Sequence, residues 1–474
     1  MLDVLIIGAG ITGSLIAHEL SKQDLKIALL DKENDVACHA TKANSAIIHS
    51  GHDPKPGTLK ARFNVEGNRM YPGLCEELKV DYKQIGAYVV SSSKEQNETL
   101  DNLMKQCEDR DIPYEVLDSK ALHEKEPALA DGVIKGIFLK TTGIVTPWQV
   151  CIAACEEAIL NGMELYLNEE VTSIEKMEDG FKVFTQDQSF ETKMIINCAG
   201  VYADKITEML HPSPYHITPR KGEYYVLPKI PLVHSIIYPV PTKKGKGVLA
   251  VPTVHGNILI GPNASDIEDK EDVSTGLGLD EVRTKITEII KDVPLHQTIH
   301  TYSGLRPSGD LHDFYIQEDD SVQNFIHVSC IDSPGLASAP AISSYVVKEL
   351  VLPKFETKPK EEYIRRKKHI VFDECSDEEK NALIQQDPEY GKIVCRCEKV
   401  TLAEMKDVIH RPCGATTVQG VKRRVRAGMG KCQGGFCQPV VVNILAKELN
   451  VPASQICNEQ ADSNVVVGTA KEDF

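Results

Sequence analysis

Four cysteines near the end of the chain have the spacing of a metal-binding set. They form two close pairs, Cys395 with Cys397 and Cys432 with Cys437, which is a C-x-C followed later by a C-x4-C. Two such pairs can supply four thiolates to one centre, and the predicted helices between them would bring the pairs together. Zinc also accepts four thiolates, but its usual loops are C-x2-C or longer. The spacing therefore favours an iron–sulfur centre over zinc.

A second chemical motif stands at the start of the chain. The glycines Gly8, Gly10 and Gly13 fit G-x-G-x-x-G and follow directly on an apolar strand predicted at residues 4–7. In such a turn the first glycine permits the bend, the second lets a pyrophosphate approach the backbone, and the third lets the following helix pack against the strand. That helix, predicted at residues 11–21, offers its N-terminal N–H groups to phosphate. The motif predicts a bound dinucleotide.

The element that follows the turn strengthens this interpretation. A strand predicted at residues 26–30 ends at Asp31, about 20 residues after the turn, where a carboxylate accepts hydrogen bonds from the adenosine ribose. Strand, turn, helix, strand and acidic residue together form half of a dinucleotide-binding sheet. The fold class is therefore α/β.

Length and charge set limits on the rest of the protein. With 474 residues the chain exceeds the size of most single domains, so two or three domains are expected. The net charge of −16 argues against nucleic acid or an anionic membrane as a general partner. Met1 stands directly before the first strand, and no apolar run reaches the roughly 18 residues of a membrane helix. We expect a cytoplasmic protein, with any membrane association supplied by a partner.

The segment at residues 43–61, with His49 in a run of small residues before Asp53 and Pro54, resembles a known family. It looks like the flavin-facing segment of the FAD-dependent amine and hydroxy-acid oxidoreductases related to D-amino-acid oxidase, and most like their glycerol-3-phosphate dehydrogenase and oxidase branch. The resemblance implies FAD rather than NAD. It assigns FAD binding to Gly8, Gly10, Ile11, Thr12, Gly13, Asp31, Lys32, Thr41, Asn44, Ser45, Ile48, Val171, Ala199, Gly200, Gly335 and Leu336.

The C-terminal part resembles a second family. Residues 416–437 closely match the 2Fe-2S module of the bacterioferritin-associated ferredoxin type, which also ends the large subunit of anaerobic glycerol-3-phosphate dehydrogenases. The resemblance assigns Cys395, Cys397, Cys432 and Cys437 to the cluster and leaves Cys413 as a packing residue. The basic segment 422–426 would either offset the charge of the cluster or face a partner, and the sequence does not decide between these uses.

Together the two resemblances imply a dehydrogenase that exports electrons. Flavin accepts a hydride and an iron–sulfur cluster carries electrons singly. We expect oxidation of sn-glycerol 3-phosphate to dihydroxyacetone phosphate, with His49 as the base, since imidazole titrates near neutrality. Arg306 is expected to fix the anionic group of the substrate, with Lys246 and Ser333 as further substrate-binding residues. An electron-accepting partner is also expected, and a second flavoprotein subunit or a quinone-linked protein is the natural choice.

The resemblance also implies an architecture. A Rossmann-like FAD-binding domain is interleaved with a mixed-sheet substrate domain, and a small, mainly helical iron–sulfur domain follows. We expect the FAD-binding domain at residues 1–81, 141–212 and 301–355, the substrate domain at 82–140 and 213–300, a linker at 356–390, the 2Fe-2S-binding domain at 391–445 and a tail at 446–474.

Three alternatives remain open. An L-2-hydroxyglutarate or other 2-hydroxy-acid dehydrogenase shares much of the segment around His49, although Asp53 and Pro54 favour the glycerol phosphate branch. Opine and amine dehydrogenases also combine FAD with this type of cluster. The chain could instead be an electron-transfer subunit without catalysis of its own, but His49 and Arg306 count against that.

Overall fold

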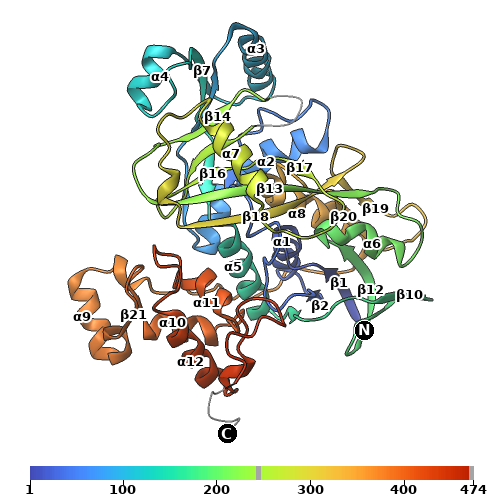
Figure 1. Ribbon diagram of the computed structural model, residues 1–474. Coiled ribbons are helices and arrows are strands. Elements are labelled where there is room, and N and C mark those ends of the chain that lie inside the picture. Colours follow the sequence, from blue (N-terminus) through green and yellow to red (C-terminus); the bar gives the residue numbers. More distant parts are fainter. Residues whose placement is uncertain (242–246, 469–474) are drawn as a thin grey trace.

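The computed structural model describes residues 1–241 and 247–468, and Figure 1 shows their arrangement. Two large sheets form the body of the molecule, and the segment from about residue 377 onward forms a smaller, mainly helical part beside α5 (Pro147–Leu160). The α/β class, the two interleaved sheets and the helical C-terminal part confirm the predicted architecture.

The first sheet is built around β1 (Leu2–Ile7). β1 pairs in parallel with β2 (Ile27–Leu30) on one side and with β12 (Ser189–Asn197) on the other. Val4, Leu5 and Ile6 have no exposed surface, as expected for a parallel strand covered on both faces. The remaining strands are β9 (Glu164–Tyr166), β10 (Ser173–Met177), β11 (Gly180–Phe184), β19 (Tyr315–Glu318) and β20 (Phe325–Ser329).

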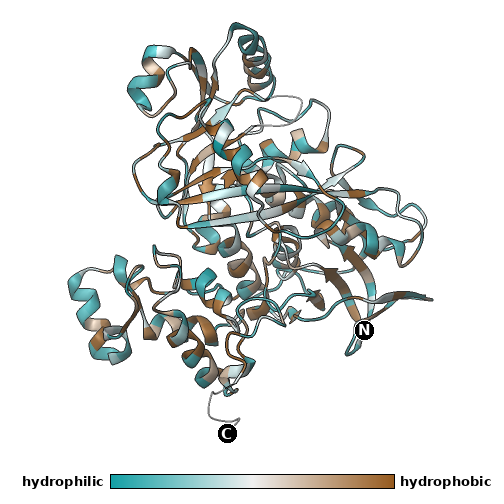
Figure 2. Ribbon diagram, in the orientation of Figure 1, coloured by the Kyte–Doolittle hydropathy of each residue, from teal (hydrophilic) through white to brown (hydrophobic). Residues whose placement is uncertain are grey.

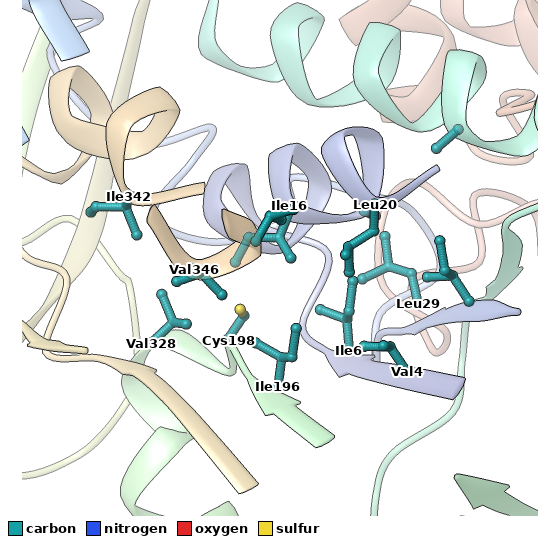
Figure 3. Close-up of a cluster of buried hydrophobic side chains, with 14 of the residues drawn as sticks. Val4, Ile6, Ile16, Leu20, Leu29, Ile196, Cys198, Val328, Ile342 and Val346 are labelled. Atoms are coloured by element: carbon teal, nitrogen blue, oxygen red, sulfur yellow. The ribbon is translucent and has the colours of Figure 1, made fainter. Parts of the chain in front are cut away.

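Helices α1 (Ile11–Leu20), α5 and α8 (Gly335–Tyr345) pack on this sheet. Figure 3 shows Ile16 and Leu20 of α1 above Ile6 and Leu29 of the strands, with Ile342 beside them in the same cluster. Figure 2 shows the N-terminal strand in brown, in contrast to the teal helices at the outer edges of the molecule. Burial of this apolar layer holds the carboxyl ends of β1, β2 and β12 in place, which is the edge where nucleotides bind.

The second sheet is mixed and lies against the first. Its order is β17-β13-β16-β15-β14-β5-β7-β6, with β18 on β13, and only β14 and β5 run parallel. The strands are β5 (Ala87–Ser91), β6 (Tyr114–Asp118), β7 (Lys135–Leu139), β13 (Ile217–Lys229), β14 (Ile236–Pro239), β15 (Leu249–Pro252), β16 (Asn257–Gly261), β17 (Ser265–Asp266) and β18 (His300–Gly309). β18 carries this sheet past the predicted boundary at residue 301, and the domain boundaries stay predictions.

The other elements connect and flank the two sheets. A small antiparallel sheet of β3 (Ile47–Ile48), β8 (Gly143–Val145) and β4 (Tyr82–Lys83) carries the segment that leads to His49. The accompanying helices are α2 (Leu59–Leu78), α3 (Lys94–Asp109), α4 (Ser119–Lys125), α6 (Ala203–Glu208) and α7 (Gly276–Ile286).

The C-terminal part has its own apolar core. It comprises α9 (Asp377–Gln386), β21 (Ile393–Cys395), β22 (Val400–Thr401), α10 (Leu402–His410), α11 (Val418–Val425) and α12 (Gln438–Leu449). A capping box in which Thr401 and Glu404 satisfy each other's backbone N–H groups starts α10. The side chain of Thr417 accepts from the Gly420 N–H and starts α11. These signals set the ends of the helices that carry the cysteine loops.

A buried ion pair joins this part to the first sheet. Arg424 of α11 donates from Nη1 to Asp35 Oδ2 at 2.8 Å and from Nη2 to Asp35 Oδ1 at 2.9 Å, and Arg423 adds a bond of 2.9 Å to Oδ2. All three side chains are buried. Burial opposes the ionisation of Asp35, but the two guanidinium groups lower its pKa to about 2. The stabilisation is thus complete above about pH 4 and is lost as the pH falls towards 2.

Other contacts surround this ion pair. Trp148 at the start of α5 donates from Nε1 to the Arg423 carbonyl at 3.0 Å. Arg411 and Arg366 both bind the buried carboxylate of Glu156, at 2.8 and 2.6 Å. The basic segment 422–426, whose use the sequence left undecided, therefore serves in large part to fix the C-terminal part to the first sheet.

Within the described residues, no helix is both long enough and apolar enough to cross a membrane.

We predict that Arg424→Met destabilises the contact between the C-terminal part and the first sheet. The change leaves Asp35 buried without its main partner, which typically costs about 3–5 kcal/mol. Limited proteolysis between residues 356 and 390 should become faster, and the midpoint of denaturant unfolding should fall.

Lys399→Met is the matched control. Lys399 forms an exposed ion pair with Asp373 at 2.8 Å, and such pairs contribute at most about 1 kcal/mol. If Arg424→Met resists protease and denaturant as well as Lys399→Met does, the ion pair does not hold the two parts together.

Candidate functional site

A cavity of about 590 Å³ lies where the carboxyl ends of the first sheet meet the second sheet. Nearly all the residues expected to bind FAD line it: Gly8, Gly10, Ile11, Thr12, Asp31, Lys32, Thr41, Asn44, Ser45, Val171, Ala199, Gly200, Gly335 and Leu336. Gly13 and Ile48, which are both buried, are not in the lining. His49, Arg306 and Ser333 line the same cavity, whereas Lys246 lies outside the described residues.

The glycine turn has no space for side chains at its two ends. Gly8 has a φ of +106°, and a Cβ there would lie 2.4 Å from the Cys198 carbonyl oxygen. A Cβ on Gly13 would lie 2.0 Å from the Gly8 carbonyl oxygen. At Gly10, by contrast, a Cβ would meet nothing nearer than Thr41 Oγ1 at 3.4 Å, so this position opens into the cavity. A turn that is tight at its ends and open at its centre fits a pyrophosphate.

Two polar side chains brace the turn. Asp31 accepts from the Ala9 N–H at 2.7 Å and from the Glu33 N–H at 2.9 Å, and Thr41 Oγ1 accepts from the Ile11 N–H at 3.0 Å. Burial raises the pKa of Asp31, although the two backbone bonds act against that rise. An ionised carboxylate has about four acceptor positions, so Asp31 can still accept from ribose hydroxyls.

The second sheet holds the segment before His49. Tyr302 donates to the Asn44 carbonyl at 2.9 Å, and Tyr224 hydrogen bonds to the Ser45 hydroxyl at 3.1 Å. The two tyrosine rings stack at 4.6 Å, which fixes both hydroxyl groups. The cavity wall at residues 44–45 is thus supported from β13 and β18.

His49 is buried and oriented by a tyrosine from β14. The Tyr238 hydroxyl lies 2.8 Å from His49 Nδ1, and Asn64 donates to the His49 carbonyl at 2.7 Å. Burial raises the pKa of Tyr238 well above its ordinary value, so its hydroxyl stays protonated and neutral. His49 is therefore held in place by hydrogen bonds at both its imidazole ring and its backbone carbonyl.

Arg306 extends from β18 into the cavity across a glycine. A Cβ on Gly222 would lie 2.4 Å from Arg306 Nη2, so the glycine in β13 makes room for the guanidinium group. That group donates weakly to the Asn263 carbonyl at 3.4 Å. Arg220, directly opposite Arg306 in the strand pair, is neutralised by Asp266 at 2.6 and 3.1 Å. Arg306, by contrast, forms no ion pair with a carboxylate among the described residues.

A partly buried acidic residue completes this end of the cavity. Asp332 forms an ion pair with Lys60 at 2.6 Å. Burial raises the pKa of Asp332, and Lys60 and Arg306 act in the opposite direction. Ser333 follows Asp332 at the cavity wall, just before the N-terminus of α8. The polar groups at this end therefore include both a carboxylate and cationic side chains.

The four predicted metal-ligating cysteines come together in two pairs. Cys397 Sγ and Cys432 Sγ lie 3.6 Å apart at the surface. Cys395 and Cys437 belong to the buried core, where burial and the neighbouring Cys395 thiol raise the pKa of Cys437 to about 12. Burial opposes ionisation at Cys432 as well, but the Cys397 thiol and the backbone N–H groups of residues 434–436 lower its pKa.

The spacing of these sulfur atoms distinguishes two kinds of centre. Four thiolates on one tetrahedral zinc ion with bonds of about 2.3 Å would all lie about 3.8 Å from one another. Here no three of the four sulfur atoms lie within 4.8 Å of each other among the described residues. The sulfur atoms instead form two separate close pairs, Cys397 with Cys432 and Cys395 with Cys437. Two pairs of thiolates suit a cluster of two metal ions better than a single ion. Cys413 lies apart from the set, in the core of the first sheet beside Cys155.

Sequence reasoning missed several residues of the site. The sequence does not mark Tyr238, Arg220 or Asp332 as site residues, because their roles depend on contacts across the sheets. Tyr238 stands in Tyr-Pro-Val-Pro, where prolines within a short strand were the available signal of an unusual local structure. No signal in the sequence connected it to His49, which is 189 positions away.

Fold and site together define a flavin-dependent oxidoreductase with an iron–sulfur centre. Residues 3–349 match the FAD dependent oxidoreductase family, and residues 393–447 match the BFD-like [2Fe-2S] binding domain. The chain belongs to the FAD dependent oxidoreductase family.

Individual relatives narrow the comparison. The chain is 44% identical to a glycerol 3-phosphate dehydrogenase of Caloramator mitchellensis over the full length of both proteins. It is 33% identical to a glycerol 3-phosphate oxidase of Mycoplasma genitalium over 74% of this chain and 95% of the relative. Its fold resembles the FAD-bound L-alpha-glycerophosphate oxidase of Mycoplasma pneumoniae, with a TM-score of 0.74 and 28% identity over 77% of this chain and 98% of that one.

The cofactors are FAD and a 2Fe-2S cluster. The glycine turn, Asp31 and the walls of the cavity would hold FAD, and the two cysteine pairs would hold the cluster. In both places the donor groups fit the cofactor, since the turn leaves room for phosphate and the sulfur atoms stand in pairs.

We predict that Cys397→Ser and Cys437→Ser each abolish the cluster. Each change removes one of four thiolate ligands, so iron and acid-labile sulfide should fall from two atoms of each per chain to near zero while bound flavin is retained. Metal and sulfide analysis of the purified chain measures both.

Cys457→Ser is the control, because Cys457 is a partly exposed thiol outside the set whose contacts are to nearby backbone carbonyls. One zinc per chain in place of iron and sulfide, or full iron content in both ligand variants, would contradict the assignment.

Proposed function

We propose that this protein oxidises sn-glycerol 3-phosphate at C2 to dihydroxyacetone phosphate and passes the electrons through its cluster to an acceptor. The observation that carries the proposal is that His49 and Arg306, a base and an anion-binding group, stand on the wall of the cavity formed by the dinucleotide turn. The full-length similarity to a glycerol 3-phosphate dehydrogenase supports this substrate over others.

The cofactors supply the electron chemistry: bound FAD accepts a hydride, and a 2Fe-2S cluster carries one electron at a time. The protein must then bind a small anion, remove a hydroxyl proton and keep the reacting carbon in place. The side chains of the cavity divide these tasks between its two polar regions.

His49 takes the proton of the C2 hydroxyl. The Tyr238 hydroxyl lies 2.8 Å from Nδ1, and the role of base requires the tautomer in which Nδ1–H donates to it, because that tautomer leaves the lone pair on Nε2. The neutral Tyr238 hydroxyl fixes the ring orientation without adding a charge that would hold the proton permanently. A base of this kind contributes about 10²- to 10⁴-fold to a rate.

Arg306 binds the phosphate group. Its planar fork of N–H donors suits phosphate oxygens, and Gly222 leaves space for it to turn towards the cavity. Ser333 offers a hydroxyl at the same wall, and Lys246 stays a further candidate from the sequence. Arg220 donates two hydrogen bonds to the carboxylate of Asp266, so its charge is already paired. Arg306 is therefore the arginine that binds the substrate.

Cys395, Cys397, Cys432 and Cys437 would hold the cluster, which would supply one-electron transfer towards an external acceptor. A second flavoprotein subunit or a quinone-linked protein suits the task, because both accept electrons one at a time. The location of the cluster in a part firmly joined to the first sheet supports a fixed route from the cavity outward.

Anaerobic bleaching of the flavin tests the substrate. We predict that glycerol 3-phosphate bleaches the bound flavin, whereas L-2-hydroxyglutarate, opines and amino acids do so at least tenfold more slowly, because a site built for one anionic group rejects poorly matched substrates. Stopped-flow absorbance of the oxidised protein measures the rates. Faster bleaching by L-2-hydroxyglutarate would favour a 2-hydroxy-acid dehydrogenase, and no bleaching by any compound would favour an electron-transfer subunit.

We predict that His49→Asn slows flavin reduction by glycerol 3-phosphate about 10²- to 10⁴-fold at unchanged FAD content, because asparagine cannot accept the proton. Tyr238→Phe should keep most of the FAD and shift the pH dependence of the rate, since it removes only the hydrogen bond to His49. Wild-type rates in His49→Asn would show that His49 is not the base.

A further inference from the structure

One edge of the cysteine site is open to solvent. Cys397 is exposed and Cys432 is partly exposed, while Cys395 and Cys437 are buried beneath them. The two loops that carry the outer pair pack against each other, since a Cβ on Gly430 would lie 2.3 Å from Cys397 Cβ. An electron can therefore leave the protein at the Cys397/Cys432 edge over a short distance.

Basic side chains adjoin this edge. Arg396 precedes Cys397 and Lys431 precedes Cys432, both are exposed, and neither forms an ion pair within the described part of the chain. By contrast, Arg423, Arg424 and Arg426 of the same domain are all paired with carboxylates. The unpaired positive charges beside Cys397 and Cys432 contrast with the net charge of −16 on the whole chain.

Apolar side chains complete the surface. Phe436, next to Cys437, is 84% exposed, and Val440, in the first turn of α12, is 44% exposed. Pro439 between them is exposed too. Exposed aromatic and aliphatic side chains together with charged ones are typical of protein interfaces. We call Arg396, Lys431, Phe436, Pro439 and Val440 the cluster face.

We propose that the cluster face docks the electron acceptor, and that this acceptor is a protein with an acidic surface around its own redox centre. The inference depends on the electron export of the proposed function. Charge complementarity selects the occupant, because Arg396 and Lys431 attract an acidic protein while the rest of this acidic chain repels it, which orients the encounter at the cysteines. One electron passes to the haem or flavin of the acceptor at each encounter, so two encounters follow each oxidised substrate molecule.

The test uses an acidic b-type cytochrome as the probe, with a basic c-type cytochrome for comparison. Calorimetry at low salt should detect binding of the acidic probe, and raising the salt should weaken it. Lys431→Glu and Phe436→Ser should each weaken binding at least tenfold while iron content and flavin bleaching by glycerol 3-phosphate stay at wild-type levels. Lys447→Glu, the same charge change near the far end of α12, is the matched control and should stay within twofold of wild type.

Several outcomes would overturn the proposal. Tighter binding of the basic cytochrome, or equal binding by Lys431→Glu and Lys447→Glu, would show that the cluster face does not select an acidic protein. Sedimentation with vesicles of phosphatidylcholine and phosphatidylserine that is lost in Lys431→Glu would make the face a membrane contact, and self-association lost in the same variant would make it a contact between copies. If the flavin is not bleached but the acidic cytochrome still binds at this face, the proposed substrate fails and the docking surface stands.

Discussion

The ion pair between Asp35 and Arg424 is the constraint on which the arrangement of the two redox sites depends. Asp35 lies four positions after Asp31, in the loop that leaves the carboxyl edge of the first sheet. Arg424 lies in α11, between Cys397 and Cys432 in the sequence. A charge buried in this way is tolerated only when its hydrogen-bonding groups are satisfied. Asp35 meets that condition with bonds from both arginines and from the Val36 N–H. The cluster-binding part is therefore fixed to the FAD-binding part through the loop that follows β2.

Local patterns predicted the elements that local interactions determine. The helices at residues 94–109 and 377–386 each begin directly after a serine whose side chain caps the first turn, so the signal for each start lies in the adjacent sequence. The glycine turn could be predicted because backbone atoms lie so close to Gly8 and Gly13 that no residue with a side chain fits there. The cysteine spacing was readable because thiolate ligands have few substitutes.

Features that depend on distant pairings could not be predicted. β18 joins the second sheet because it pairs with β13 along ten positions, and nothing within residues 300–309 specifies that partner. The contact of Tyr238 with His49 follows from the parallel pairing of β14 with β5, which only the complete sheet determines. The sequence likewise left the basic segment at 422–426 open, because its main partner, Asp35, is nearly 400 positions away and carries no motif of its own.

Trp148 gives this arrangement a spectroscopic consequence. It is the only tryptophan of the chain, and its indole lies at the contact between α5 and the Arg423 backbone. All the indole fluorescence of the protein therefore originates at the junction of the flavin-binding and cluster-binding parts. Quenching by either cofactor, or a red shift when the junction opens, can be followed at this one position without any introduced label.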